Sequence, residues 1–169
     1  MGVTAGPADW WVASPEAIDS LAIGCPVATT LPDDSRIICK AGGKAWIIAP
    51  CYTEVIERWG NYTACGAIDN MGSVFCDITS TNFPVLYNRL ISCGFNPSDW
   101  FVPCFQLLQN PGYVCRTNWD SVYTLTAYWS STEFDATQAY CVRFSLGDGG
   151  PAGSKVSCFP VRAFRCVTY

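Results

Sequence analysis

The side chains that could carry out catalysis in this chain do not form a recognisable catalytic set. The sequence has no histidine, and histidine is the base that activates the nucleophile in Ser–His and Cys–His dyads. Its 14 acidic residues leave a paired-carboxylate glycosidase open, yet nothing in their spacing aims two of them at each other. Glu54 and Glu57 are three residues apart on a possible helix, which is the spacing of a solvated helix face. We therefore do not expect an enzyme.

Charged residues near the end of the chain offer a binding chemistry instead. Arg143, Arg162 and Arg165 follow Glu133 and Asp135 in sequence. Guanidinium groups placed in this way form structural ion pairs with the carboxylates, or else they bind an anionic sugar. The sequence leaves both interpretations open.

Metal binding has one candidate residue outside any recognised motif. Asp148 lies in the glycine-rich segment 147–153, where its carboxylate either ligates calcium through oxygen or forms the turn itself. The chain has no CxxC pair and no histidine, so a zinc site is not expected. No cofactor is predicted, with calcium as the one possibility.

The 11 cysteines are unusually many for a domain large enough to hold a core. Disulfides formed in an oxidising setting would explain them, and buried free thiols are the alternative, because cysteine packs as a small hydrophobe. Cys39 and Cys51 flank a predicted hairpin, and Cys141 and Cys158 lie on predicted neighbouring strands, so these four are the disulfide candidates. An odd count leaves at least one cysteine free or bonded to another chain.

Composition limits the kinds of partner. The net charge is −4 and no basic run is present, so nucleic-acid binding is not expected. The longest apolar stretches, such as residues 45–50, are too short to span a bilayer, so no membrane insertion is expected. Only 14% of residues are charged while half are hydrophobic, which favours contact with other proteins or further copies of the chain. A compact monomer is the alternative.

Helices are predicted in the first two thirds of the chain. Ser14-Pro15-Glu16 is a helix start, with serine as N-cap and proline at the first position, and Gly24 ends that helix. Residues 35–49 form a hairpin around Gly42-Gly43. Further helices are predicted at residues 53–59, 82–93 and 105–109, with an extended segment at 99–103 between the last two.

The last third of the chain is predicted to be β-rich. Strands are expected at residues 123–130, 138–145, 155–159 and 161–167, with a loop at 147–153. Strand aromatics are expected to pack in the core rather than to form a carbohydrate platform; these core residues are Trp46, Trp100, Trp129, Phe144 and Phe164. The fold class is therefore α+β, with residues 1–35 as an N-terminal docking arm and residues 36–169 as the domain.

Five sequence blocks, in this order, resemble the DUF1566 family, which includes the C-terminal domain of the Legionella collagen-like adhesin and domains of phage tail fibres. The resemblance covers roughly residues 36–167. Cys104 stands where the family has serine, Gln106-Leu107 stands where it has Glu-Leu, and the dense cysteines are not typical of it. The blocks are Ala45–Pro50, Asp99–Pro103 with Gln106–Leu108, Tyr128–Glu133, Ala139–Phe144 and Val161–Arg165.

The resemblance implies a C-type-lectin-like fold with an early β-hairpin, two or three short helices and a C-terminal antiparallel meander. Lectin-like domains often use a Trp-Asn-Asp calcium motif; Asn118-Trp119-Asp120 has these residue types in another order and matches it poorly. With Glu133 and Asp148, these residues are the predicted ligand-binding set. The loops around residues 61–80, 115–122 and 146–154 are expected to meet a host surface glycan or protein.

The resemblance also implies a role on the surface of a phage particle. The expected function is that of a tail fibre or tail-associated adhesin, which would bind a host surface glycan or protein and other virion proteins. The alternative is a decoration protein that clamps capsid or tail subunits without binding a receptor.

Overall fold

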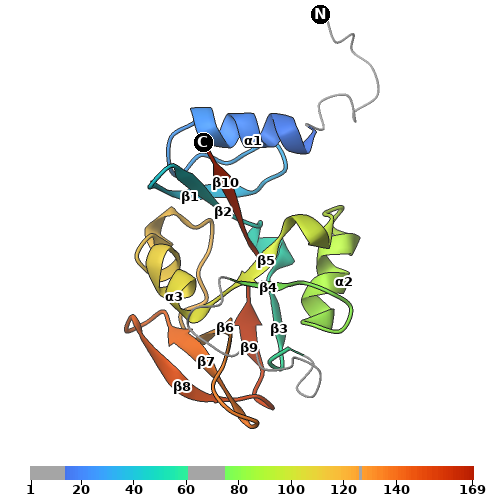
Figure 1. Cartoon of the computed structure of the whole chain (residues 1–169), viewed down its shortest axis with the longest axis vertical. Helices are drawn as coiled ribbons and strands as arrows, with labels where there is room; N and C mark the ends of the chain where they lie inside the picture. The colour runs from blue at the N-terminus through green and yellow to red at the C-terminus, as the bar shows by residue number, and fades with distance from the viewer. Residues whose placement is uncertain (1–13, 61–74, 126) are drawn as a thin grey trace, which may run out of the picture.

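Five strands form the central antiparallel sheet of the computed structural model, which describes residues 14–60, 75–125 and 127–169 (Figure 1). The strand order is β1-β2-β10-β5-β4. The last strand therefore pairs with the second, and the C-terminus lies beside the first helix (Figure 1). The strands are β1 Arg36–Ala41, β2 Lys44–Ile48, β4 Phe75–Asp77, β5 Phe101–Pro103 and β10 Phe164–Thr168.

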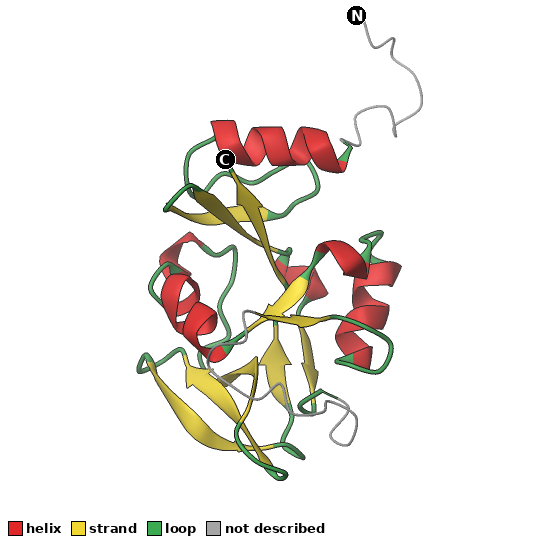
Figure 2. Ribbon diagram, viewed as in Figure 1, coloured by secondary structure: helices red, strands yellow, loops and turns green. Residues whose placement is uncertain are grey.

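Two smaller antiparallel sheets complete the β-structure. Strand β3 (Val55–Glu57) pairs with β9 (Phe159–Val161). Strands β6 (Ala127–Glu133), β7 (Gln138–Arg143) and β8 (Asp148–Ser154) form a three-stranded meander, which lies at the opposite end of the molecule from the β1–β2 hairpin (Figure 2).

Helices and helical turns cover these sheets. The α-helices are α1 (Pro15–Gly24), α2 (Pro84–Ser92) and the single turn α3 (Phe105–Leu107). Short 3-10 turns occur at η2 (Cys51–Thr53), η3 (Pro97–Asp99) and η5 (Arg116–Asn118), and η4 (Leu108–Tyr113) is a π-helical turn. No helix among the described ranges is long and apolar enough to cross a membrane. The structure is thus a mixed α+β fold with antiparallel sheets.

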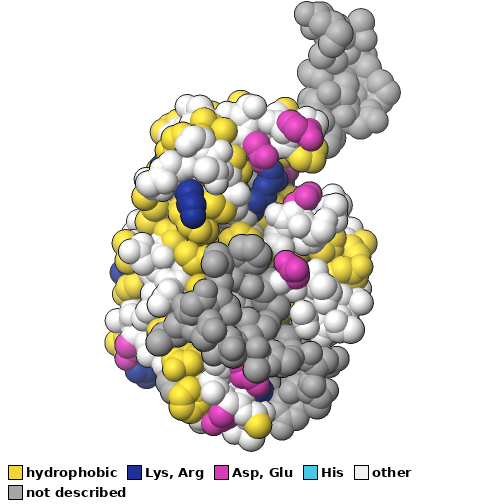
Figure 3. Space-filling view, viewed as in Figure 1, with side chains coloured by type: hydrophobic (Ala, Val, Ile, Leu, Met, Phe, Trp, Pro, Cys, Tyr) yellow, Lys and Arg dark blue, Asp and Glu magenta, His cyan; other side chains and the backbone are white. Residues whose placement is uncertain are grey.

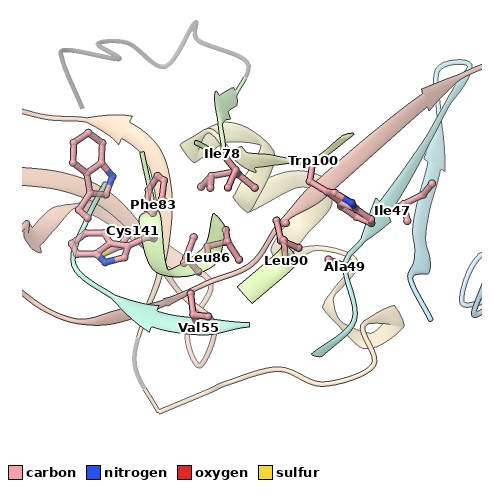
Figure 4. Close-up of a cluster of buried hydrophobic side chains, with 14 of the residues drawn as sticks. Ile47, Ala49, Val55, Ile78, Phe83, Leu86, Leu90, Trp100 and Cys141 are labelled. Atoms are coloured by element: carbon pink, nitrogen blue, oxygen red, sulfur yellow. The ribbon is translucent and has the colours of Figure 1, made fainter. Parts of the chain in front are cut away.

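Strand alternation divides the core into two clusters on opposite faces of the central sheet. Ile47 packs with α1 and α2 in a large cluster, where Leu86, Leu90 and Trp100 also lie (Figure 4). Its neighbours Trp46 and Ile48 face the other way. They belong to the aromatic cluster, which comprises Ile38, Trp46, Ile48, Phe101, Phe105, Leu108, Trp119, Tyr128, Val142, Phe144 and Phe164.

The predicted helix at residues 82–93, the early hairpin and the predicted core residues are found in the structure. Helix α2 begins only at Pro84, because Phe83 has left-handed backbone (φ 53°) and proline fixes the first helical position. Gly42 and Gly43 both have positive φ and close the hairpin turn. The five predicted core aromatics, Trp46, Trp100, Trp129, Phe144 and Phe164, are all buried.

Three predictions of local structure are wrong. The strand predicted at residues 155–159 is a turn as far as Cys158, and β9 begins only at Phe159. Residues 53–59 form no helix: after η2, the β-branched Val55 and Ile56 extend into strand β3, which pairs with β9. The segment 147–153 is not a loop, because most of it is strand β8, paired with β7 from Asp148 to Ser154. Gly149 and Gly153 suit this strand, since a Cβ at either position would clash with Cys141 or Trp129.

The boundary predicted at residue 35 does not separate an arm from the domain among the described residues. Ser14 caps α1 by accepting a hydrogen bond from the Ala17 amide at 3.2 Å. Ile18 and Ala22 of this helix, with Leu31 after it, are buried in the large cluster. Residues 14–35 therefore belong to the packed domain, and residues 1–13 lie outside the described part of the chain.

The nine described cysteines are all free thiols, so the disulfide prediction is not confirmed. Cys39 is half-buried on β1 and Cys51 is exposed at η2. Cys141 is buried on β7, whereas Cys158 is exposed. Cys65 and Cys76 are not described at the side-chain level.

Candidate functional site

Arg162 is the centre of a charged cluster that includes Asp120, one residue of the predicted binding set. Its side chain is 1% exposed and lies directly after β9. The guanidinium forms ion pairs with Asp120 and with Glu54 at 3.3 Å, and it donates to the Ala49 carbonyl at 2.9 Å. Asp120 also accepts the Cys51 amide at 2.6 Å. Asp120 thus holds an internal arginine in place.

The pKa values of the two carboxyl groups around Arg162 shift in opposite directions. Desolvation raises the pKa of Glu54, although the Tyr128 hydroxyl donates to it at 2.7 Å. Desolvation also acts on Asp120, but the charge of Arg162 and the hydrogen bonds from Arg162 and Cys51 together outweigh it and lower the pKa of Asp120. Opposed shifts of this kind occur at acid–base sites. Here Arg162 and the two carboxyl groups bind one another and neighbouring protein groups, which is the arrangement of a structural ion-pair network.

Glu133 also pairs internally. Its Oε1 forms an ion pair with Lys155 Nζ, and the Lys155 side chain is only 2% exposed. The same ammonium lies over the Trp59 ring, 4.9 Å from its centroid. The predicted ion pair between Glu133 and an arginine is therefore wrong, because Glu133 pairs with Lys155, which lies in the segment after β8.

The remaining members of the predicted Asn118-Trp119-Asp120 motif also face inward. Asn118 Nδ2 donates to the Ile38 carbonyl at 3.0 Å and fixes η5 to β1. Trp119 is 5% exposed and packs in the aromatic cluster against Tyr128, Phe144 and Phe164. The predicted ligand-binding residues therefore do not converge on one open site.

Asp148 alone lies in a surface hollow, which we call the Asp148 pocket. It measures about 410 Å³ and lies on the β6–β8 meander. Asp148 Oδ1 accepts from Arg143 Nε at 2.7 Å, and this hydrogen bond lowers the pKa of Asp148. Exposed Leu125 lines the same pocket. No cluster of three potential metal-ligating side chains occurs in the described ranges, and Asp148 is engaged by arginine.

A larger hollow, the α1 groove, lies between α1, the turn before β1 and the segment from Cys93 to Trp100. It measures about 520 Å³. Figure 3 shows acidic and basic side chains close together below α1. Arg165, on one wall, forms an ion pair with Asp19 of α1. The aromatic and acidic side chains that line the groove are Tyr52, Phe95, Trp100, Asp33, Asp34 and Asp99.

The groove combines flat apolar surface with hydrogen-bond acceptors. Tyr52 is 47% exposed, and its hydroxyl donates to Asp34 at 3.2 Å. Burial and this hydrogen bond raise the pKa of Tyr52 to about 12, so the hydroxyl stays protonated at neutral pH. Aromatic faces with carboxylates around them suit the stacking and hydrogen bonding of a polyhydroxylated ligand.

Sequence reasoning missed the α1 groove because its lining comes from five separated segments. Asp33 and Asp34 follow a proline, as turn residues do, and Tyr52 belongs to no motif. Asp99 and Trp100 begin the predicted extended segment 99–103, but Asp99 lies in η3 and strand β5 begins only at Phe101. Across the groove they face Arg165, which lies far along the sequence. No local spacing brings such residues together.

Glu57 is a buried carboxyl that sequence reasoning placed on a solvated face. It is 5% exposed, and its two oxygens accept the Val85 and Leu86 amides at 3.0 and 3.1 Å at the start of α2. Desolvation raises the pKa of Glu57 to about 7 despite these two donors. A carboxyl with a raised native pKa binds its proton more tightly in the folded than in the unfolded state, so ionisation opposes folding.

Stability is accordingly expected to fall as pH rises from about 4.5 to 7. Below the unfolded pKa of about 4.5 both states are protonated, and through the window the native state alone keeps the proton. We expect the free energy of unfolding of the wild type to drop by up to about 3 kcal/mol relative to Glu57→Gln. Urea denaturation of both proteins at several pH values measures this difference. Parallel pH profiles for the two proteins would contradict it.

Comparison with known proteins gives no family to set beside these observations: no protein-family model matches the chain, and no curated protein matches it.

Proposed function

We propose that the chain is a structural and adhesive protein of a phage virion, built on a C-type-lectin-like fold of the DUF1566 kind. Support comes from where the five blocks of the resemblance lie. They coincide with β2, β5, β6, β7 and the β9–β10 segment. The blocks are thus the packed framework, and the segments between them would serve as recognition loops on a rigid scaffold.

The α1 groove is the observation that carries the adhesive function. Most of the residues that line the groove lie outside those blocks. The groove opens to solvent, and Tyr52, Asp34 and Asp99 are among its lining residues. Concave sites with an apolar floor and a few convergent polar groups are the usual form of a ligand site. A host surface glycan fits this chemistry.

A second candidate function, that of a decoration protein, is favoured by a different surface. Leu125, in the Asp148 pocket, is 83% exposed, and Leu146, two residues before Asp148, is 65% exposed. Side chains of this kind become buried when a protein packs against a neighbouring subunit. This surface would clamp capsid or tail subunits and would need no receptor.

Binding to host cells tests the adhesive function. The purified chain, fluorescently labelled, is expected to bind cells of the host strain, and antibody against it should block adsorption of the particle. Tyr52→Ser with Asp99→Asn should reduce cell binding at least tenfold, because these changes remove the aromatic face and one acceptor from the groove.

Ile56→Ser is the matched control, since Ile56 is 54% exposed on β3 and lines neither hollow. It should bind cells as the wild type does. If the wild-type chain binds no cells, and particles lacking it lose heat or salt resistance, the decoration function holds instead.

A further inference from the structure

Two cysteines far apart in sequence meet beside the aromatic cluster. Cys39 lies on β1, opposite Trp46 of β2, and Cys115 lies directly before η5. Both are half-buried and pack against the aromatic cluster. Cys39 is close enough to Cys115 to contribute, after burial, to the raised pKa of the Cys115 thiol. The fold therefore places the two side chains next to each other where η5 is hydrogen-bonded to β1.

Neighbouring contacts fix the approach of these two segments. Asn118 Nδ2 donates to the Ile38 carbonyl at 3.0 Å, one residue before Cys39. Arg116 donates to the Tyr113 carbonyl at 3.0 Å, and its guanidinium stacks 3.9 Å from the centre of the Tyr113 ring. The Asn118 hydrogen bond thus ties the segment after Cys115 to β1, and the Arg116–Tyr113 contacts close the turn around Cys115.

The sheet register separates Cys39 from the other half-buried cysteine of this face. Cys39 pairs with Trp46, and Trp46 pairs with Cys166 of β10. Cys166 is therefore two strand spacings from Cys39, about 9.6 Å, whereas the Cα atoms of a disulfide lie roughly 4.4–6.8 Å apart. The predicted partner Cys51 lies beyond the end of β2, where its amide binds Asp120.

We propose that Cys39 and Cys115 are a disulfide-forming pair that closes when the protein meets a disulfide oxidant. The bond would fasten the segment containing η4 and η5 to β1 over the aromatic cluster. The pairing follows from the observed side-by-side placement, and it does not depend on the adhesive or decoration function.

The chemistry is thiol–disulfide exchange with a small-molecule disulfide such as oxidised glutathione. The Cys39 thiolate attacks one sulfur of the oxidant, the oxidant's S–S bond breaks, and one glutathione thiolate leaves. Cys115 then loses its proton and attacks the Cys39 sulfur of the mixed disulfide, which releases the second glutathione. Two cysteine thiols are oxidised and one disulfide is reduced to two thiols. Burial, together with the neighbouring Cys39 thiol, raises the pKa of Cys115 to about 11, so Cys115 is mostly protonated at neutral pH and the second step is expected to be faster at alkaline pH.

Peptide mapping of the native chain tests the pairing without any substitution. The reduced protein is incubated with oxidised glutathione under native conditions, its remaining thiols are alkylated, and it is digested with trypsin and chymotrypsin. Cleavage after Arg36, Lys40, Tyr113 and Arg116 releases residues 37–40 and 114–116, each with a single cysteine. These two peptides are expected to appear joined in most molecules.

The same mixture in concentrated urea is the control for proximity, because the unfolded chain pairs its 11 cysteines without this preference. The oxidised native protein should melt about 5–15 °C higher than the reduced protein. This rise should persist in Cys158→Ser and vanish in Cys115→Ser. Recovery of the two peptides separately alkylated, or joined to other cysteines, from the folded protein would overturn the proposal.

Discussion

Arg162→Met is expected to lower the free energy of unfolding by about 3–5 kcal/mol. The arginine side chain is 1% exposed, and it compensates the partly buried carboxylates of Glu54 and Asp120. Removing it leaves both charges without a cation and frees the Ala49 carbonyl that Arg162 caps. Urea denaturation followed by tryptophan fluorescence measures the loss.

Arg143→Met is the matched control for this change. Arg143 also pairs with an aspartate, but both side chains are about half exposed, and exposed ion pairs contribute little. Its unfolding midpoint should equal that of the wild type. The stability of Arg162→Lys should fall between these two variants, because lysine keeps the charge but lacks the planar fork that reaches four acceptors. Equal small effects of Arg162→Met and Arg143→Met would contradict the structural role of Arg162.

Lys155→Met is expected to have an effect of similar size, about 3–5 kcal/mol. The Lys155 ammonium is buried against Glu133 and the Trp59 ring. Glu133 Oε2 is itself buried and has no hydrogen-bond partner among the described residues. Loss of the lysine therefore leaves the Glu133 carboxylate without a cation in an apolar setting. This costs more free energy than the intact ion pair contributed to stability.

A double-mutant cycle separates the stranded charge from lost packing. Lys155→Met with Glu133→Leu removes both charges and should recover at least half of the loss seen in Lys155→Met alone. The free energy of unfolding from urea titrations gives each corner of the cycle. If the double variant is as unstable as Lys155→Met alone, Lys155 stabilises the protein through packing and the ion pair contributes little.

Much of the framework could be predicted from sequence because it rests on local patterns. Ser14-Pro15 sets the start of α1, Gly42-Gly43 sets the hairpin, and alternation around Trp46 sets the two faces of β2. The failed prediction of strand β8 also has a local physical cause. Strand β8 is rich in glycine, which reads as loop, yet its glycines are what close packing against Cys141 and Trp129 requires.

The candidate sites could not be predicted, because charge pairing and grooves are set by tertiary contacts. Glu133 and Asp120 looked like free ligands, but Lys155 and Arg162 reach them from segments 22 and 42 residues away. Glu57 looked solvated and caps α2 from a buried strand instead. Asp148 does line a surface hollow, but it is bound by Arg143.

Location on the particle tests the proposed function most directly. Intact virions are labelled with antibody against this chain and with gold conjugate, and viewed by electron microscopy. The adhesive function predicts label at the tail tip or fibres, where the α1 groove could meet a host surface. Label spread over the capsid would contradict it and would favour the decoration function through the surface around Leu125 and Leu146.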